Sequence, residues 1–202
     1  MDIKISRILE KIAELEKDLE HALLGDNEEK QKEFKYRIEK EKILFEEEMR
    51  RLQGQMKKGV ISFLLDTPLM SLLVAPVIYS LYLPLLLLDL WIYVYQAVCF
   101  WAYGISRVKR SDFVVLDRGK LPYLNAIEQF NCNYCGYANG LVAYAREVAS
   151  KTELYFCPIK HARKVLGVHP RYWRYQEFGD GEGYRNEVDH LREEVKKSPP
   201  QA

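Results

Sequence analysis

The pattern of hydrophobic and polar positions divides the chain into three parts, and the middle part is the most distinctive. Residues 60–104 contain only two charged side chains, Asp66 and Asp89, and the 22 residues from Thr67 to Leu88 contain none. A helix needs about 20 consecutive apolar residues to cross the hydrocarbon core of a bilayer, so the whole run is about twice as long as one span. The pattern predicts a membrane anchor over residues 60–105.

The length of this anchor favours two helices that form a hairpin. Pro84 lies near the middle of the run, and a proline inside a helix removes a backbone hydrogen bond, so we predict a turn there. Basic residues flank the run on both sides, and such flanks stay in the cytoplasm. We therefore expect both termini to be cytoplasmic. Two full spans and a re-entrant hairpin both satisfy this condition, and a pair of buried helices in a soluble core is the third possibility. The flanking residues are Arg50, Arg51, Lys57 and Lys58 before the run, and Arg107, Lys109, Arg110, Arg118 and Lys120 after it.

Asp89 is the ionisable residue that lies deepest in the apolar run, and Gln96 follows seven residues later on the same helix face. A carboxylate inside a membrane is a functional candidate, which would suit a transporter or channel component. If Pro84 marks the tip of a hairpin, however, Asp89 lies only about one turn from the far interface. We prefer this second interpretation, in which water solvates the carboxylate.

The first part of the chain, residues 1–59, has the pattern of a coiled-coil arm. An apolar heptad seam is followed by a break around Gly25 and then by a second apolar stripe, so we predict two helices of about 23 and 29 residues. The two helices could fold on each other as an antiparallel hairpin or pair with another chain. This arm, through residues 1–58, would bind a protein partner or a second copy of the chain. It carries 14 basic and 15 acidic residues, a balance that argues against nucleic acid. The seam comprises Ile5, Ile8, Ile12, Leu15, Leu19 and Ala22, and the stripe comprises Phe34, Ile38, Phe45, Met49, Leu52 and Met56.

The third part, residues 106–202, contains the candidate chemistry. Cys132 and Cys135 form a C-x2-C pair followed by glycine, and after 21 residues come Cys157 and His161 in a C-x3-H arrangement. Pro158 at a first helical position would make Cys157 an N-cap residue, where the helix dipole favours a thiolate. Three thiolates and one imidazole form a tetrahedral set that suits Zn²⁺. We predict a structural zinc site in a small helical domain.

Other interpretations of the cysteines remain open. An iron–sulfur cluster could use the same four side chains, and the C-x2-C pair or Cys157 could carry out thiol redox or nucleophilic chemistry. A structural disulfide does not suit a cytoplasmic domain, and the cysteines could also be buried by coincidence. His169 is a possible substitute for His161 as the fourth metal ligand.

The stretch from Asp117 to about Arg185 resembles a family of uncharacterised bacterial proteins. The resemblance rests on the Cys132–Gly140 motif CNYCGYANG, the Cys157–Ala162 motif CPIKHA and the Gly179–Arg185 motif GDGEGYR. It covers about a third of the chain and implies a bacterial source, and hence the inner (cytoplasmic) membrane. It implies no activity.

Together these observations predict a mainly α protein. It would have a coiled-coil arm (1–59), a two-helix membrane hairpin (60–105) and a cytoplasmic Cys3His domain (106–202). The expected function is a non-enzymatic, membrane-anchored scaffold or adaptor with a structural zinc. The alternative is a membrane-bound thiol-redox or metal-dependent enzyme that uses the C-x2-C pair and Cys157.

Overall fold

The computed structural model describes residues 7, 11, 14, 15, 18, 19, 30–34, 36–39 and 42–197. The chain is mainly helical, as expected, and it divides into two compact units. The first unit comprises Met1–Gly59 with Lys120–Asn125, and the second comprises Val60–Gly119 with Ala126–Ala202.

The described part of the first unit contains a short β-hairpin and a helix. Strand β1 (Tyr36–Glu39) pairs antiparallel with β2 (Lys42–Phe45), and helix α2 (Glu47–Gln55) follows. The rings of Tyr36 and Phe45, which are opposite each other in the register, lie 5.7 Å apart. The predicted continuous helix through this region is therefore wrong: Tyr36–Glu39 and Lys42–Phe45 pair as two strands, and the Tyr36 and Phe45 rings contact each other across them.

The coiled-coil seam lies mostly outside the described residues. Leu15 and Leu19 are described, and both are helical and exposed. Ile5, Ile8, Ile12 and Ala22 lie outside, so the coiled-coil arm stays a prediction.

The second unit begins with the apolar run, which forms α3 (Val60–Asp66), α4 (Leu69–Ser80), α5 (Tyr82–Tyr95), the π-helical η1 (Gln96–Phe100) and α6 (Trp101–Tyr103). Only Leu81 separates α4 from α5, and its φ of -63° and ψ of -18° are right-handed helical. Residues Leu69–Tyr103 thus act as one 35-residue helix that is apolar enough to cross a membrane. It ends at Gly104, which adopts a left-handed φ of 68° that glycine allows.

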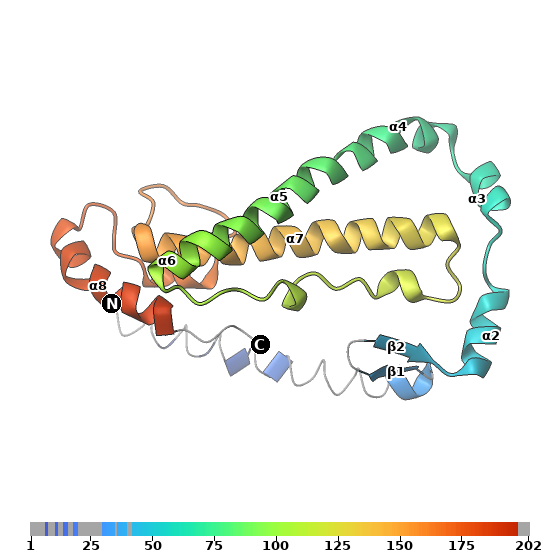
Figure 1. Cartoon of the computed structure of the whole chain (residues 1–202), viewed down its shortest axis with the longest axis horizontal. Coiled ribbons are helices and arrows are strands. Elements are labelled where there is room, and N and C mark those ends of the chain that lie inside the picture. The colour runs from blue at the N-terminus through green and yellow to red at the C-terminus, as the bar shows by residue number, and fades with distance from the viewer. Residues whose placement is uncertain are drawn as a thin grey trace. The chain divides into compact units, whose positions relative to one another are not determined.

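The expected turn at Pro84 is not formed. Pro84 occupies the third position of α5, where its missing N–H costs little because N–H groups in the first turn lack helical partners. The chain continues in the same general direction from α4 through α5 to α6 (Figure 1). The anchor is therefore one long helix in this structure, and the two-helix hairpin is not confirmed.

After α6 the chain runs back as an irregular return segment (residues 104–119), which includes the 3-10 turns η2 (Arg110–Asp112) and η3 (Arg118–Lys120) at its end. Helix α7 (Ala126–Phe156) then lies beside the apolar helix (Figure 1). The two are parallel, since contacts advance along both together: Tyr79 bonds Asn131, Asp89 bonds Tyr137 and Tyr95 bonds Thr152.

The core of the second unit lies between these two helices and the return segment. It contains apolar residues of α5 and η1, of the return segment and of α7, and the amphipathic α8 (Gly181–Lys197) completes it. The buried members include Leu85, Ile92, Phe100, Ile105, Val108, Leu141, Tyr144, Val148, Leu191 and Val195.

Candidate functional site

The structure separates the cysteines that were expected to bind zinc. Cys132 and Cys135 lie in the first third of α7, and Cys157 directly follows its last residue. Because α7 is continuous, Cys135 and Cys157, which are 22 positions apart, are separated by about 33 Å at 1.5 Å per residue. Among the residues that the structure describes, no group of three or more His, Cys, Asp or Glu side chains could hold a metal ion. The predicted C-x2-C knuckle is thus a turn of helix, and the zinc site stays a sequence-based prediction that this arrangement does not support.

Cys157 lies at the C-terminal end of a helix, whereas the sequence predicted a position at a helix N-terminus. Its N–H donates to the Glu153 carbonyl at 2.8 Å, which closes the last turn of α7, and Pro158 follows outside the helix. The predicted N-cap is wrong, and the negative end of the helix dipole does not favour a thiolate there. Nearby, Lys160 pairs with Glu177, and the His161 N–H donates to the Tyr172 hydroxyl at 2.7 Å. The helix N-terminus that was expected to activate Cys157 is therefore not present.

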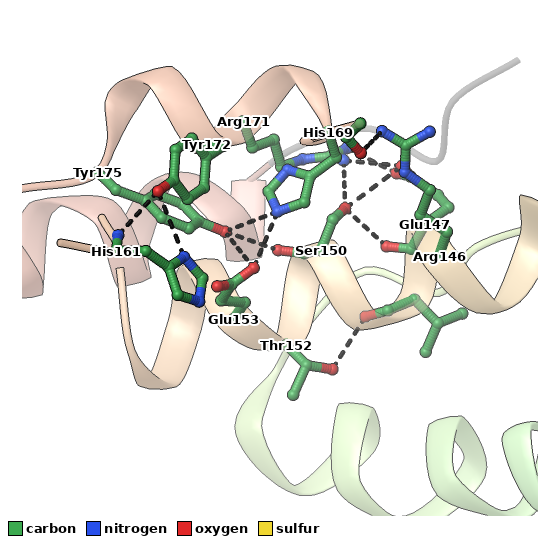
Figure 2. A network of polar contacts seen from close by, with 12 residues as sticks. Arg146, Glu147, Ser150, Thr152, Glu153, His161, His169, Arg171, Tyr172 and Tyr175 are labelled. Carbon is green, nitrogen blue, oxygen red and sulfur yellow. Dashed lines mark hydrogen bonds and ion pairs between the residues drawn. The ribbon is translucent and has the colours of Figure 1, made fainter. Parts of the chain in front are cut away.

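A network of polar side chains instead joins α7 to the 3-10 helix η4 (Pro170–Arg174) (Figure 2). Glu147, Ser150 and Glu153 follow each other at intervals of three residues and so share a face of α7. Arg171 makes two hydrogen bonds to Glu147, of 2.8 Å from Nη1 and 2.7 Å from Nη2. Its Nη1 also donates to Ser150 Oγ at 2.7 Å. Such a two-bond arginine–carboxylate pair fixes orientation as well as distance.

His169 and Tyr175 form the second half of this network. His169 Nε2 lies 2.9 Å from Glu153 Oε2, and the buried Tyr175 hydroxyl lies 3.4 Å from the same oxygen. Burial, together with the nearby Glu153 carboxylate, raises the pKa of Tyr175 above its usual value near 10. The hydroxyl is therefore a proton donor throughout the neutral range and holds the segment after η4 against α7.

Lys151 is the most deeply buried charged residue of the described chain, with 1% of its surface exposed. Its Nζ donates to the Ser106 Oγ at 2.8 Å and to the Ser106 carbonyl at 3.1 Å. Desolvation and the nearby Arg171 charge lower the pKa of Lys151. The pair ties the start of the return segment to the last third of α7.

The chemistry of this network is that of a clamp. Ser150 lies beside charged groups, as a nucleophile would, but it is 1% exposed, donates to the Glu147 carbonyl and accepts from Arg171. The network therefore stabilises the packing of η4 on α7.

Sequence reasoning did not single out the acidic and hydroxyl members of this network. The signal was present as the spacing of Glu147, Ser150 and Glu153 on α7, opposite the basic and aromatic residues that follow His169. His169 was noted only as a substitute metal ligand, and in the structure it pairs with Glu153 instead.

A second polar cluster surrounds Asp89 on the apolar helix. Arg110 of the return segment donates from Nε to both Asp89 oxygens, at 2.9 and 3.1 Å, and from Nη2 to Oδ2 at 2.7 Å. The Tyr137 hydroxyl donates to Oδ2 at 3.0 Å. Asp89 is thus neither an isolated intramembrane carboxylate nor a solvated one: it is paired on the side of the helix that faces α7. The structure lends no support to the transporter interpretation.

The most extensive surface feature of the second unit is apolar. No residue of α3 or α4 is buried, and α5 buries only Leu85 and Ile92. The rest of the large apolar side chains point outward along the whole helix. The most exposed are Ile61, Leu65, Leu69, Met70, Leu73, Val77, Leu83, Leu87, Leu90, Trp91, Tyr93, Val98 and Trp101. A contiguous surface of this size marks a membrane or protein contact in a folded protein.

Comparison with known proteins adds no relative: no family model, no curated protein and no solved structure matches the chain. The resemblance to a bacterial family therefore stays a prediction, and function has to be argued from this structure alone.

Proposed function

We propose that the protein is a membrane-anchored scaffold, in which the apolar helix Leu69–Tyr103 attaches the helical second unit to a lipid bilayer. One observation carries this proposal: the helix packs against α7 along one side and exposes large apolar side chains along the rest of its surface. Water would solvate this surface poorly, at a cost of about 25 cal/mol per Å², whereas lipid chains would cover it.

The scaffold role follows from what the rest of the second unit offers. Its largely buried Glu147, Lys151 and Arg171 are used in internal contacts, and the exposed apolar surface is the feature that calls for a partner. Residues 1–58 would supply the second binding element, a coiled-coil arm for a protein partner or another copy of the chain. The basic flanks favour a bacterial inner membrane with both termini in the cytoplasm.

Vesicle flotation tests the proposal. The purified full-length chain is mixed with phospholipid vesicles and centrifuged through a density gradient, alongside a Leu73→Lys/Leu87→Lys variant. Both positions are exposed, so the changes leave the core intact. We expect the wild type to float and the variant to lose at least ten-fold in vesicle binding, because two charges oppose insertion.

The matched control is Ala149→Lys, which adds a charge at an exposed position of α7 away from the apolar surface. This variant should float like the wild type. Equal flotation of all three proteins would show that the helix does not make the attachment, and a wild type that stays at the bottom of the gradient would refute the proposal.

A further inference from the structure

The exposure of the apolar helix changes along its length, and this change bears on how the helix meets a membrane. In α4, the five positions Leu69, Met70, Leu72, Leu73 and Val74 are all exposed. At 100° per residue these positions cover about 200° around the helix axis. The side that holds Ala75 and Tyr79 is half-buried, and Tyr79 contacts Asn131 and Tyr134 of α7 there. Helix α4 is thus exposed and apolar over more than half of its circumference.

From α5 onward the helix is exposed mainly on one side. Leu83, Leu87, Leu90, Val94, Val98 and Trp101 recur there at intervals of three and four residues, and the exposed Leu86, Trp91 and Tyr93 flank them in the same outward stripe. The opposite side holds the buried Leu85, Ile92, Gln96 and Phe100. Asp89 lies on this covered side, where it meets Arg110 and Tyr137. The outward stripe itself carries no charge, and two of its members are tryptophans, the residue typical of the membrane interface.

The return segment, which packs on α5 and η1, carries polar groups that are unfavourable in the hydrocarbon core of a bilayer. The return segment is irregular and exposes Arg107, Lys109 and Arg110 directly beside α5 and η1. Exposed irregular backbone does not occur in the lipid core, because its polar groups would have no partners, and exposed basic side chains are costly there. A full crossing by all 35 residues would place Arg110 near the bilayer centre, since its partner Asp89 lies close to the midpoint of Leu69–Tyr103.

We infer that the protein is monotopic: α4 enters the hydrocarbon of one leaflet obliquely, while α5 and α6 lie at the headgroup level with their apolar stripe toward the lipid. The inference rests on the proposed membrane attachment and specifies its geometry. The length agrees, because the 12 residues of α4 extend about 18 Å and one leaflet of hydrocarbon is about 15 Å thick. The return segment and α7 remain on the aqueous side.

Depth-dependent quenching of tryptophan fluorescence tests this geometry. Four full-length variants each keep one tryptophan: Trp91, Trp101, Trp173, or a new one from Val77→Trp, with the remaining native tryptophans replaced by phenylalanine. They are bound to phosphatidylcholine and phosphatidylglycerol vesicles whose acyl chains carry bromine either near the carbonyl or near the terminal methyl. Val77, Trp91 and Trp101 are all highly exposed, so these substitutions spare the core.

We expect the Val77→Trp probe to be quenched more strongly by the deep bromines, and Trp91 and Trp101 more strongly by the shallow ones. Trp173, on η4, should stay unquenched. A helix that crosses the bilayer along its full length would instead make Trp91 deeper than the Val77 probe, which would overturn the inference. Quenching of Trp173 would also overturn it, because η4 would then be immersed.

The two proposals fail in different ways. If no variant binds vesicles, membrane attachment itself is refuted. If the variants bind but the order of depths is reversed or flat, attachment stands and the one-leaflet geometry is wrong.

Discussion

Gly140 shows how a single missing side chain positions the return segment on α7. A Cβ atom at Gly140 would lie 2.5 Å from the Phe113 carbonyl oxygen and 2.9 Å from the Val114 Cα, both of which belong to backbone. Gly136, one turn earlier, faces the Val115 carbonyl at 3.3 Å from its ideal Cβ. The two glycines thus form a shallow groove on α7 in which the extended chain lies.

Gly140→Ala is therefore expected to destabilise the second unit by about 1–3 kcal/mol, since backbone has to move to admit the methyl group. Urea unfolding in mild detergent, followed by circular dichroism, measures this change. Gly181→Ala is the control, because a Cβ at Gly181 meets nothing within 4 Å. A Gly140→Ala protein as stable as the control would show that the groove is not closely packed.

Tyr175 makes a pH-dependent contribution whose sign follows from its environment. Its pKa is raised in the folded protein by burial and by Glu153, while in the unfolded chain it stays near 10. The folded state therefore retains a proton that the unfolded state loses, so the stabilisation is fully present below pH 10 and is lost as the pH rises above it.

We expect the free energy of unfolding of the wild type to fall more steeply between pH 10 and 11 than that of Tyr175→Phe. Guanidinium titrations at pH 8, 10 and 11 compare the two proteins. The difference between them at pH 8 should shrink at pH 11, and a difference that is constant or grows would contradict the assigned environment.

The elements themselves divide into those that the sequence predicted and those that it did not. The helical apolar segment was predicted because it has a continuous pattern, the absence of charge from Thr67 to Leu88. The 31-residue α7 was not predicted as one helix, because the C-x2-C pair followed by Gly136 was interpreted as part of a zinc site. The role of Gly136 and Gly140 is visible only with the return segment in place, since close contact with a distant backbone is a tertiary constraint.

The candidate site was mispredicted for a related reason. Four residues with metal-ligand spacing suggest a shared ion only if the chain between them folds back, and α7 keeps them apart. The clamp of Glu147 and Arg171 went unnoticed because 24 residues separate its members.

The clamp is expected to hold η4 against α7. Both side chains are largely buried, each 13% exposed, so removal of one partner leaves an unpaired charge inside the protein. Arg171→Met should therefore cost about 3 kcal/mol in the free energy of unfolding. Arg171→Met combined with Glu147→Gln should cost less than the sum of the two single changes, because the neutral amide no longer requires a counter-ion.

Arg174→Met is the matched control, since its partner Glu194 forms a more exposed pair, and its loss should stay below about 1 kcal/mol. Thermal and urea unfolding in detergent compare the wild type with the two single variants, the double variant and the Arg174→Met control. Additive effects of the Arg171 and Glu147 changes would show that the two residues do not act as a pair.

At the scale of the whole molecule, the apolar helix and the basic residues at its two ends constrain topology. A full crossing would place the residues before and after the helix on opposite sides of the membrane, whereas insertion into one leaflet places them on the same side. The basic flanks independently favour the same side, because positive residues remain in the cytoplasm. The basic flanking residues and the exposure of the apolar helix therefore both predict that the two ends of the helix lie on the same side of the membrane.

Labelling from the two membrane faces measures this directly. One variant carries Gly59→Cys with the four native cysteines replaced by serine, and a second keeps only Cys157, which is exposed. Membrane vesicles of both orientations are treated with a maleimide that does not cross lipid, and detergent-solubilised samples provide the total reactivity. Both sites should react from the cytoplasmic face and be protected from the other. Reaction from opposite faces would mean that the helix crosses the bilayer, and Asp89 with Arg110 would then form a buried ion pair inside it.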